Sequence, residues 1–306
     1  MTDAHGALEA RVVRYADLKP CLNAFIDTRT PGSESKENFT IIGPGVSENP
    51  DQHVHIAEPH GFNIGGARQP PGCVNSQHSH DTAEVFVVHT GRWRFDFGET
   101  GEDASVEATA GDVVSFPTKA FRGFANIGTG TEPGFLWSVL GGDDPGRVTW
   151  APRVFEMARE YGLQLLENGA LIDTTRGEAP PPGVAPMPPT DRATVEALRR
   201  MTAADVGSVI ARADDGRGER LLIGEGGVLA PTEGFTLSRL TLAAGEDADG
   251  VAGGPEVVFV HKGAVAVTLD DGMVMLRAGD TMTVPVGPAR RFTTDTGATL
   301  FVVRGT

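Results

Sequence analysis

Two histidines and a glutamate have the types and the spacing to bind a metal ion. They lie in the segment GCVNSQHSHDTAEVFVVHTG between Gly72 and Gly91. His78 and His80 are two residues apart, so on a strand both side chains point to the same face. Glu84 has the same parity and opens the apolar strand that follows. Two imidazoles and one carboxylate on one face suit a divalent metal with open coordination positions.

The same residue types would also fit a surface hairpin, or a core histidine paired with a glutamate. Phe86 and Val88 continue the face of Glu84 into what should be the core. An unpaired carboxylate is costly to bury there without a cation. The pattern therefore favours a metal site.

The other histidines are weaker candidates for ligands. His89 has the opposite parity to Glu84 on the same strand and should face away from the interior. His53 and His55 are spaced like a second pair but lack a following carboxylate and a strand context, and His60 lies in the same unpatterned segment. We expect these three to be solvated or to cap local structure.

The elements that must position the predicted ligands are short strands. From Phe62 to Val139 the chain consists of β-branched and aromatic runs separated by glycine, which is typical of an all-β barrel or sandwich. The clearest runs are Glu84–His89, Arg92–Phe97, Asp112–Phe116 and Gly134–Val139. Trp93, Phe95 and Phe97 form one aromatic face, which fits core packing or the lining of a pocket.

A weak internal repeat indicates two copies of this β-fold. The segment EVFVVHTG at Glu84–Gly91 recurs as EVVFVHKG at Glu256–Gly263, and GDVVSFP at Gly111–Pro117 recurs as GDTMTVP at Gly279–Pro285. Self-similarity of this kind indicates a duplicated unit.

The segments outside the repeats look helical or irregular. We expect a helix-like piece around Tyr15–Phe25, and apolar spacing predicts a helix over Pro152–Glu167. The proline-rich stretch Ala179–Pro189 predicts a linker, and a short helix capped by Thr190 or Asp191 should run to Met201. The predicted domains are an N-terminal extension (1–60), a first barrel (61–150), a connection (151–205) and a second barrel (206–306).

Composition limits the classes of function. The 306 residues carry 26 basic and 41 acidic side chains, a net charge of −15, which argues against nucleic acid or an anionic membrane as the main partner. No apolar run is long enough for a signal peptide or a membrane span. Two widely separated cysteines support neither a disulfide framework nor a zinc site. We expect a soluble, cytoplasmic globular protein.

The residues of the first repeat resemble the cupin motifs. Gly72, His78, His80, Glu84 and Gly91 match the first motif, G-x5-H-x-H-x3-E-x6-G, at every spacing. In the segment 111–126 the second motif is matched by its glycine, proline and asparagine, whereas a lysine replaces its second glycine and an arginine its histidine. The chain thus resembles a bicupin, which implies an all-β fold of two jelly-roll barrels.

The resemblance implies one divalent metal in the first barrel, held by His78, His80 and Glu84. Iron(II) is favoured, and manganese, nickel and zinc remain open. The fourth family ligand is replaced by Arg122, which cannot ligate because its guanidinium offers only donors. Arg122 then either anchors a substrate carboxylate or enolate at the metal, or turns to the barrel mouth and pairs with an acidic residue there.

The second repeat lacks the imidazoles. Aligned to the motif, Val251 and Gly253 stand where the histidines should be, while Glu256 remains and Arg290 replaces the second-motif histidine. We expect this barrel to be structural and without metal, with Glu256 paired to Arg290 or Arg291.

These features predict a metal-dependent enzyme. The favoured reaction is that of a mononuclear iron(II) dioxygenase-like oxidoreductase acting on a small anionic substrate, a carboxylated aromatic or a dicarbonyl compound. A non-redox isomerase, lyase or hydrolase and a non-catalytic small-molecule-binding module remain alternatives, because one barrel hosts many chemistries. We expect a monomer or a homodimer.

Overall fold

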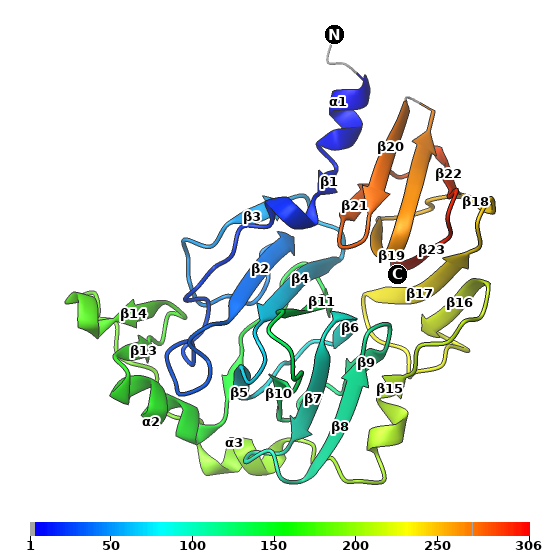
Figure 1. The fold of residues 1–306 in the computed structure, drawn as a ribbon. Helices are drawn as coiled ribbons and strands as arrows, with labels where there is room; N and C mark the ends of the chain where they lie inside the picture. The colour runs from blue at the N-terminus through cyan, green and yellow to red at the C-terminus, as the bar shows by residue number, and fades with distance from the viewer. Residues whose placement is uncertain (1–3, 271) are drawn as a thin grey trace.

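Short strands separated by glycine turns build most of the molecule, as the sequence predicts. The computed structural model describes residues 4–270 and 272–306, which fold into two β-barrels lying side by side (Figure 1). The predicted strands of the first repeat are all present, and the all-β fold class of two jelly-roll barrels is confirmed.

The first barrel is made of two sheets. The larger has the order β15-β9-β6-β11-β4-β2-β3, and the smaller has the order β12-β5-β10-β7-β8. Strands of the larger sheet are β2 (Glu37–Ile42), β3 (Val54–Ile56), β4 (Phe62–Gln69), β6 (Glu84–Thr90), β9 (Val113–Phe116), β11 (Gly134–Gly141) and β15 (Ile210–Ala211). Strands of the smaller sheet are β5 (Val74–Ser79), β7 (Arg92–Phe97), β8 (Ala104–Thr109), β10 (Arg122–Asn126) and β12 (Thr149–Trp150).

The second barrel repeats this arrangement. Its main path has the order β1-β21-β19-β23-β17-β16, with β18 paired to β22, and β20 and β22 paired to β19. Its strands are β1 (Val12–Val13), β16 (Gly218–Ile223), β17 (Phe235–Leu242), β18 (Asp247–Val251), β19 (Glu256–Leu269), β20 (Gly272–Arg277), β21 (Thr281–Val284), β22 (Ala289–Thr293) and β23 (Ala298–Gly305).

Each barrel includes a short strand from the segment that precedes the other barrel in the chain. Strand β1 pairs with β21 of the second barrel, and β15 pairs with β9 of the first. The aspartate of each repeated Gly-Asp pair fixes the added strand through a hydrogen bond from an arginine next to that strand. Asp280 accepts from Arg14, and Asp112 accepts from Arg212. A shared core also spans the two barrels, since Trp137 of the first stacks on Phe259 of the second with ring centroids 4.8 Å apart.

The helices are shorter than the sequence predicts. They are α1 (Ala4–Glu9), α2 (Pro152–Glu160) and α3 (Arg192–Ala197). The helix predicted over Pro152–Glu167 is wrong beyond Glu160, because Gly162 takes the left-handed conformation (φ +84°) and a hairpin follows. That hairpin consists of β13 (Leu163–Leu165) and β14 (Leu171–Asp173).

Three further predictions for the irregular segments have mixed outcomes. The helix-like piece at Tyr15–Phe25 is wrong, because only the turn Tyr15–Asp17 is helical and Pro20 stops its continuation. Helix α3 is capped as predicted, with the Asp191 carboxylate accepting from the Thr194 backbone N–H, but it ends well before Met201. Residues 179–189 contain no helix and no regular strand, as the linker prediction requires. None of the described helices is long and apolar enough to cross a membrane.

Candidate metal centre

The predicted ligands meet inside the first barrel. His78 and His80 lie on β5, and Glu84 is the first residue of β6 on the facing sheet. All three are buried, and one candidate ligand atom from each lies within 4.8 Å of the others. The strand parity in the sequence therefore predicts their convergence correctly, and the group can hold a metal ion.

Both imidazoles are held in the neutral form that ligates metals. The Nδ1 of His78 lies 2.7 Å from the Ser76 carbonyl oxygen, which only accepts, so Nδ1 carries the proton and Nε2 keeps its lone pair. Burial, together with the nearby charge of Arg122, lowers the pKa of His78 to about 3. The same two causes hold the pKa of His80 well below its ordinary value.

Arg122 is buried and bonded to the predicted ligand carboxylate. Its side chain is only 2% exposed, and Nη2 donates to Glu84 Oε2. The guanidinium also lies over the Phe116 ring, 5.4 Å from the centroid. The alternative in which Arg122 turns to the barrel mouth is therefore wrong: the arginine stays inside, and the acid that it meets is Glu84.

The Glu84 carboxylate is shared between two environments. One oxygen, Oε2, accepts from Arg122, and the other, Oε1, lies 3.8 Å from His80 Nε2. A carboxylate fixed in this way by a second partner is typical of metal sites, in which outer residues orient the ligands. The charges of Glu84 and Arg122 cancel, so a bound dication would leave an uncompensated positive charge in a buried place.

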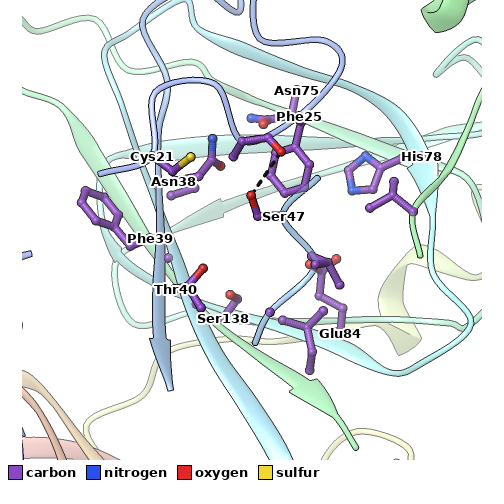
Figure 2. Close-up of a pocket in the computed structure, with 18 of the residues that line it drawn as sticks. Cys21, Phe25, Asn38, Phe39, Thr40, Ser47, Asn75, His78, Glu84 and Ser138 are labelled. Carbon is purple, nitrogen blue, oxygen red and sulfur yellow. Dashed lines mark hydrogen bonds between the residues drawn. The ribbon is translucent and has the colours of Figure 1, made fainter. Parts of the chain in front are cut away.

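A cavity opens from the triad toward the N-terminal segment (Figure 2). Its cavity volume is about 80 Å³, and the unfilled space rises to about 730 Å³ when the open mouth is counted. Aromatic side chains form its walls, and small residues lie beside them. The aromatic residues are Phe25, Phe39, Phe86, Phe124 and Trp150, and the small ones are Gly65, Gly66 and Ala67. Arg122 does not line this cavity, because it lies behind Glu84.

Sequence reasoning missed the contribution of residues 21–52 to the cavity. Cys21, Phe25, Asn38, Thr40 and Ser47, all from the predicted N-terminal extension, form the wall facing the triad in Figure 2. Strand β2 pairs with β4 of the first barrel and so carries this wall into its larger sheet.

Asn75 is a second lining residue that the sequence did not reveal. It differs from His78 in parity, so a regular strand would point the two side chains to opposite faces. The pairing of β5 with β10 is irregular here, since Arg122 faces His78 but Phe124 faces Asn75. One extra residue on β5 makes a bulge, a feature that commonly re-aims side chains beside active sites, and Asn75 reaches the cavity.

The remaining candidates lie elsewhere. Trp93, Phe95 and Phe97 are fully buried in the core and do not line the cavity. His89 faces away from the triad as predicted, and its ring contacts His261 across the barrel interface, with centroids 5.4 Å apart. Histidines 53, 55 and 60 are outside the metal-ligand cluster; the first is exposed, and the last is held by the Glu58 carbonyl oxygen.

At the equivalent place, the second barrel retains the glutamate–arginine ion pair but not the histidines. Arg290 donates to both carboxylate oxygens of Glu256, which confirms the predicted pairing. The alignment of Val251 with a motif histidine is off by one residue, since Gly250 faces Arg290 in the strand pairing as His78 faces Arg122. Val251 is 63% exposed, and a Cβ on Gly250 would come within 2.4 Å of the Arg290 guanidinium.

Comparisons with known proteins agree with this architecture. Residues 67–138 match the cupin domain family, whereas no curated protein matches the chain in sequence. Oxalate decarboxylase from Lactobacillus farciminis, solved as a formate complex, aligns over 95% of this chain and 85% of its own, with 10% identity and a TM-score of 0.58. The bacterial pirin YhhW from Escherichia coli in complex with nickel(II) aligns over 95% and 96%, with 12% identity and a TM-score of 0.54. At this identity the likeness concerns the fold.

Proposed function

Since this chain is a bicupin with a single His-His-Glu cluster among its described residues, we propose that it is a mononuclear metal-dependent enzyme. Its favoured reaction is that of an iron(II) dioxygenase-like oxidoreductase acting on a small anionic substrate. The observation that carries this proposal is the position of the cluster, which is buried at one side of a cavity with apolar walls.

The donor set fits a divalent transition metal. His78 would ligate through Nε2, His80 through an imidazole nitrogen and Glu84 through Oε1, the oxygen that Arg122 leaves free. Iron(II) held by these residues would supply dioxygen activation and a binding position for a chelating substrate. YhhW, of the same fold, is described in complex with nickel(II).

Arg122 acts in this proposal as a positioning residue. Its bond to Oε2 fixes the carboxylate and directs Oε1 toward the imidazoles. Because Arg122 lies outside the cavity lining, this role replaces the direct grip on a substrate carboxylate that the motif position suggested.

Charge and shape together favour an anionic chelating substrate with a carbon-rich body. The neutral histidines and the Glu84–Arg122 pair leave a dication uncompensated, so an anionic oxygen of the substrate balances it. The aromatic walls favour an aromatic or dicarbonyl compound over a dianion as small as oxalate, the substrate named for the decarboxylase neighbours.

Metal reconstitution followed by oxygen uptake tests the proposal. The purified chain is loaded anaerobically with iron(II) and offered hydroxybenzoates and 1,3-diketones in an oxygen electrode. We expect iron-dependent uptake with a member of this panel and none in His80→Ala. Turnover of a substrate without oxygen uptake, with an isomerised or decarboxylated product, would support the non-redox alternative instead.

A further inference from the structure

Two side-chain amides face the cavity without a hydrogen-bond partner. The Nδ2 atoms of Asn38 and Asn75 are both buried, and neither has an acceptor within the described protein. Both residues line the cavity, and Asn75 is only 8% exposed. Buried amide donors are nearly always bonded in folded proteins, so two unpaired donors on one cavity call for an acceptor there, from water or from a ligand that displaces it.

The two amides come from different sheets and lie on one side of the cavity. Asn38 is on β2 and Asn75 is on the bulged part of β5. In Figure 2 both lie across the cavity from Glu84, with Phe25 and Ser47 in the middle of the view. The metal ligands and the amides are therefore separate polar groups on one cavity, with Phe25 and Ser47 between Glu84 and the amides.

The charge of this second polar end limits what it binds. None of the described residues that line the cavity is a lysine or an arginine. A carboxylate placed against Asn38 and Asn75 would be buried without a counter-ion, which is costly. A neutral carbonyl oxygen accepts two hydrogen bonds without that cost.

From these observations we infer that Asn38 and Asn75 recognise a neutral carbonyl oxygen at the end of the substrate remote from the metal. The inference deepens the proposed function and rests on it for the position of the other end. It defines the substrate as a compact apolar molecule with a chelating anionic group at one end and a ketone, ester or amide oxygen at the other. Asn38 and Asn75 are then specificity-determining residues.

Three probes with the same chelating end test this assignment. Catechol has no remote acceptor, 3,4-dihydroxyacetophenone adds a neutral carbonyl and 3,4-dihydroxybenzoate adds a carboxylate. Binding to the full chain loaded with nickel(II) is measured anaerobically by calorimetry. We expect the acetophenone to bind about tenfold more tightly than catechol, the increment of one well-made neutral hydrogen bond, and the benzoate to gain less.

Leucine substitutions identify the residues responsible. Asn75→Leu and Asn38→Leu should each reduce the preference for the acetophenone, and the double variant should abolish it while catechol affinity is unchanged. Gln77→Leu is the matched control, since Gln77 is also on β5, buried and missing a partner at Oε1, but does not line the cavity. Equal affinity for catechol and the acetophenone in the wild type, or a preference that survives the double substitution, would overturn the inference.

A metal-free arm separates this inference from the proposed function. Acetophenone and ethylbenzene are compared on the metal-free chain by ligand-observed NMR. A preference for acetophenone that disappears in the double variant supports the amide site even where nickel and catechol fail to bind, a failure that would count against the metal site alone. No preference here overturns the amide site whatever the metal does.

Discussion

The two barrels carry the same buried ion pair and differ in what surrounds it. Glu84 meets Arg122 in the first barrel, and Glu256 meets Arg290 at the equivalent place in the second. In the second barrel a further arginine, Arg304, also donates to Glu256. Strand pairing places Arg304 opposite Glu256 as it places Leu140 opposite Glu84.

This difference distinguishes Glu256, which forms a structural ion pair, from Glu84, which is a candidate metal ligand. Glu256 receives bonds from two arginines, and both of its oxygens are engaged. Glu84 gives one oxygen to Arg122, and Leu140 lines the cavity where the second barrel has a cation. The Glu–Arg pair is thus common to both barrels, and the proposed metal site differs from the second barrel by its two histidines and by the lack of a second arginine bonded to the glutamate.

The largest expected effect comes from removing the residues that only the first barrel has. His78→Ala combined with His80→Ala should abolish binding of about one divalent ion per chain, because a lone carboxylate paired to an arginine is a poor ligand set. Metal content after equilibrium dialysis measures this. His53→Ala combined with His55→Ala is the control and should keep full occupancy. Undiminished metal in the first double variant, or two ions per wild-type chain, would contradict the assignment.

Making the first barrel resemble the second should be nearly as damaging. In Leu140→Arg a second guanidinium would reach Glu84, as Arg304 reaches Glu256, and engage Oε1. We expect metal affinity to fall at least about a hundredfold, since a ligand is lost and a positive charge is added. Leu140→Met is the control for changed shape. Retention of wild-type affinity in Leu140→Arg would show that the free oxygen of Glu84 is not what distinguishes the barrels.

The sequence predicts the triad well because its geometry is local. Residues 78, 80 and 84 need only strand parity and one short turn to converge, and both are visible in the spacing. Asn75 could not be found in this way, since a bulge on β5 reverses the parity of everything before it.

Contacts between distant segments could not be predicted from the sequence, for a different reason. The cavity wall built by residues 21–52 depends on β2 pairing with β4, and no periodicity specifies that partner. The helix-like piece predicted around Tyr15–Phe25 is wrong for a related reason, because Pro20 and the bridge from Cys21 to Asn38 prevent a helix there.

Removing the shared arginine should have different consequences in the two barrels. Arg122→Ala leaves Glu84 buried without a cation, and we expect the metal-free protein to lose about 3–5 kcal/mol of unfolding free energy. Arg290→Ala should cost less, because Arg304 still pairs with Glu256. Urea unfolding of both metal-free variants measures this; an equal loss in the two would contradict the compensation by Arg304.

Arg122→Ala should lower the free energy of unfolding but should not lower the affinity for metal. Two unit charges 4 Å apart repel by about 4 kcal/mol at an effective dielectric constant of 20, and a dication doubles this. Losing an orienting partner costs only about 10- to 100-fold in affinity, so relief of repulsion wins. We expect nickel(II) affinity in Arg122→Ala to be at least that of the wild type, and unchanged in Arg290→Ala. A clear loss in Arg122→Ala would mean that orientation dominates.

The smallest expected effect tests the symmetry of the barrel interface. Burial lowers the pKa of His89 and of His261 to about 4, with Lys262 and Arg239 adding to the effect at His261 and the His261 ring adding to it at His89. Both values are depressed below the ordinary value near 6.5, so the unfolded chain binds protons that the folded one excludes. The stability due to each neutral histidine is therefore complete above about pH 6.5 and is lost as the pH falls toward 4. One proton per group corresponds to a slope of about 1.4 kcal/mol per pH unit in this window.

His89→Phe and His261→Phe should each flatten the dependence of unfolding free energy on pH by up to that amount, and by similar amounts if the two positions are equivalent. His53→Phe, at an exposed position where slight burial and the neighbouring His55 lower the pKa of the imidazole, should flatten the slope less than either interface variant. A flattening confined to one of the two interface variants would show that the barrels use this shared position differently, because only one of the rings would then be excluded from protonation by the fold.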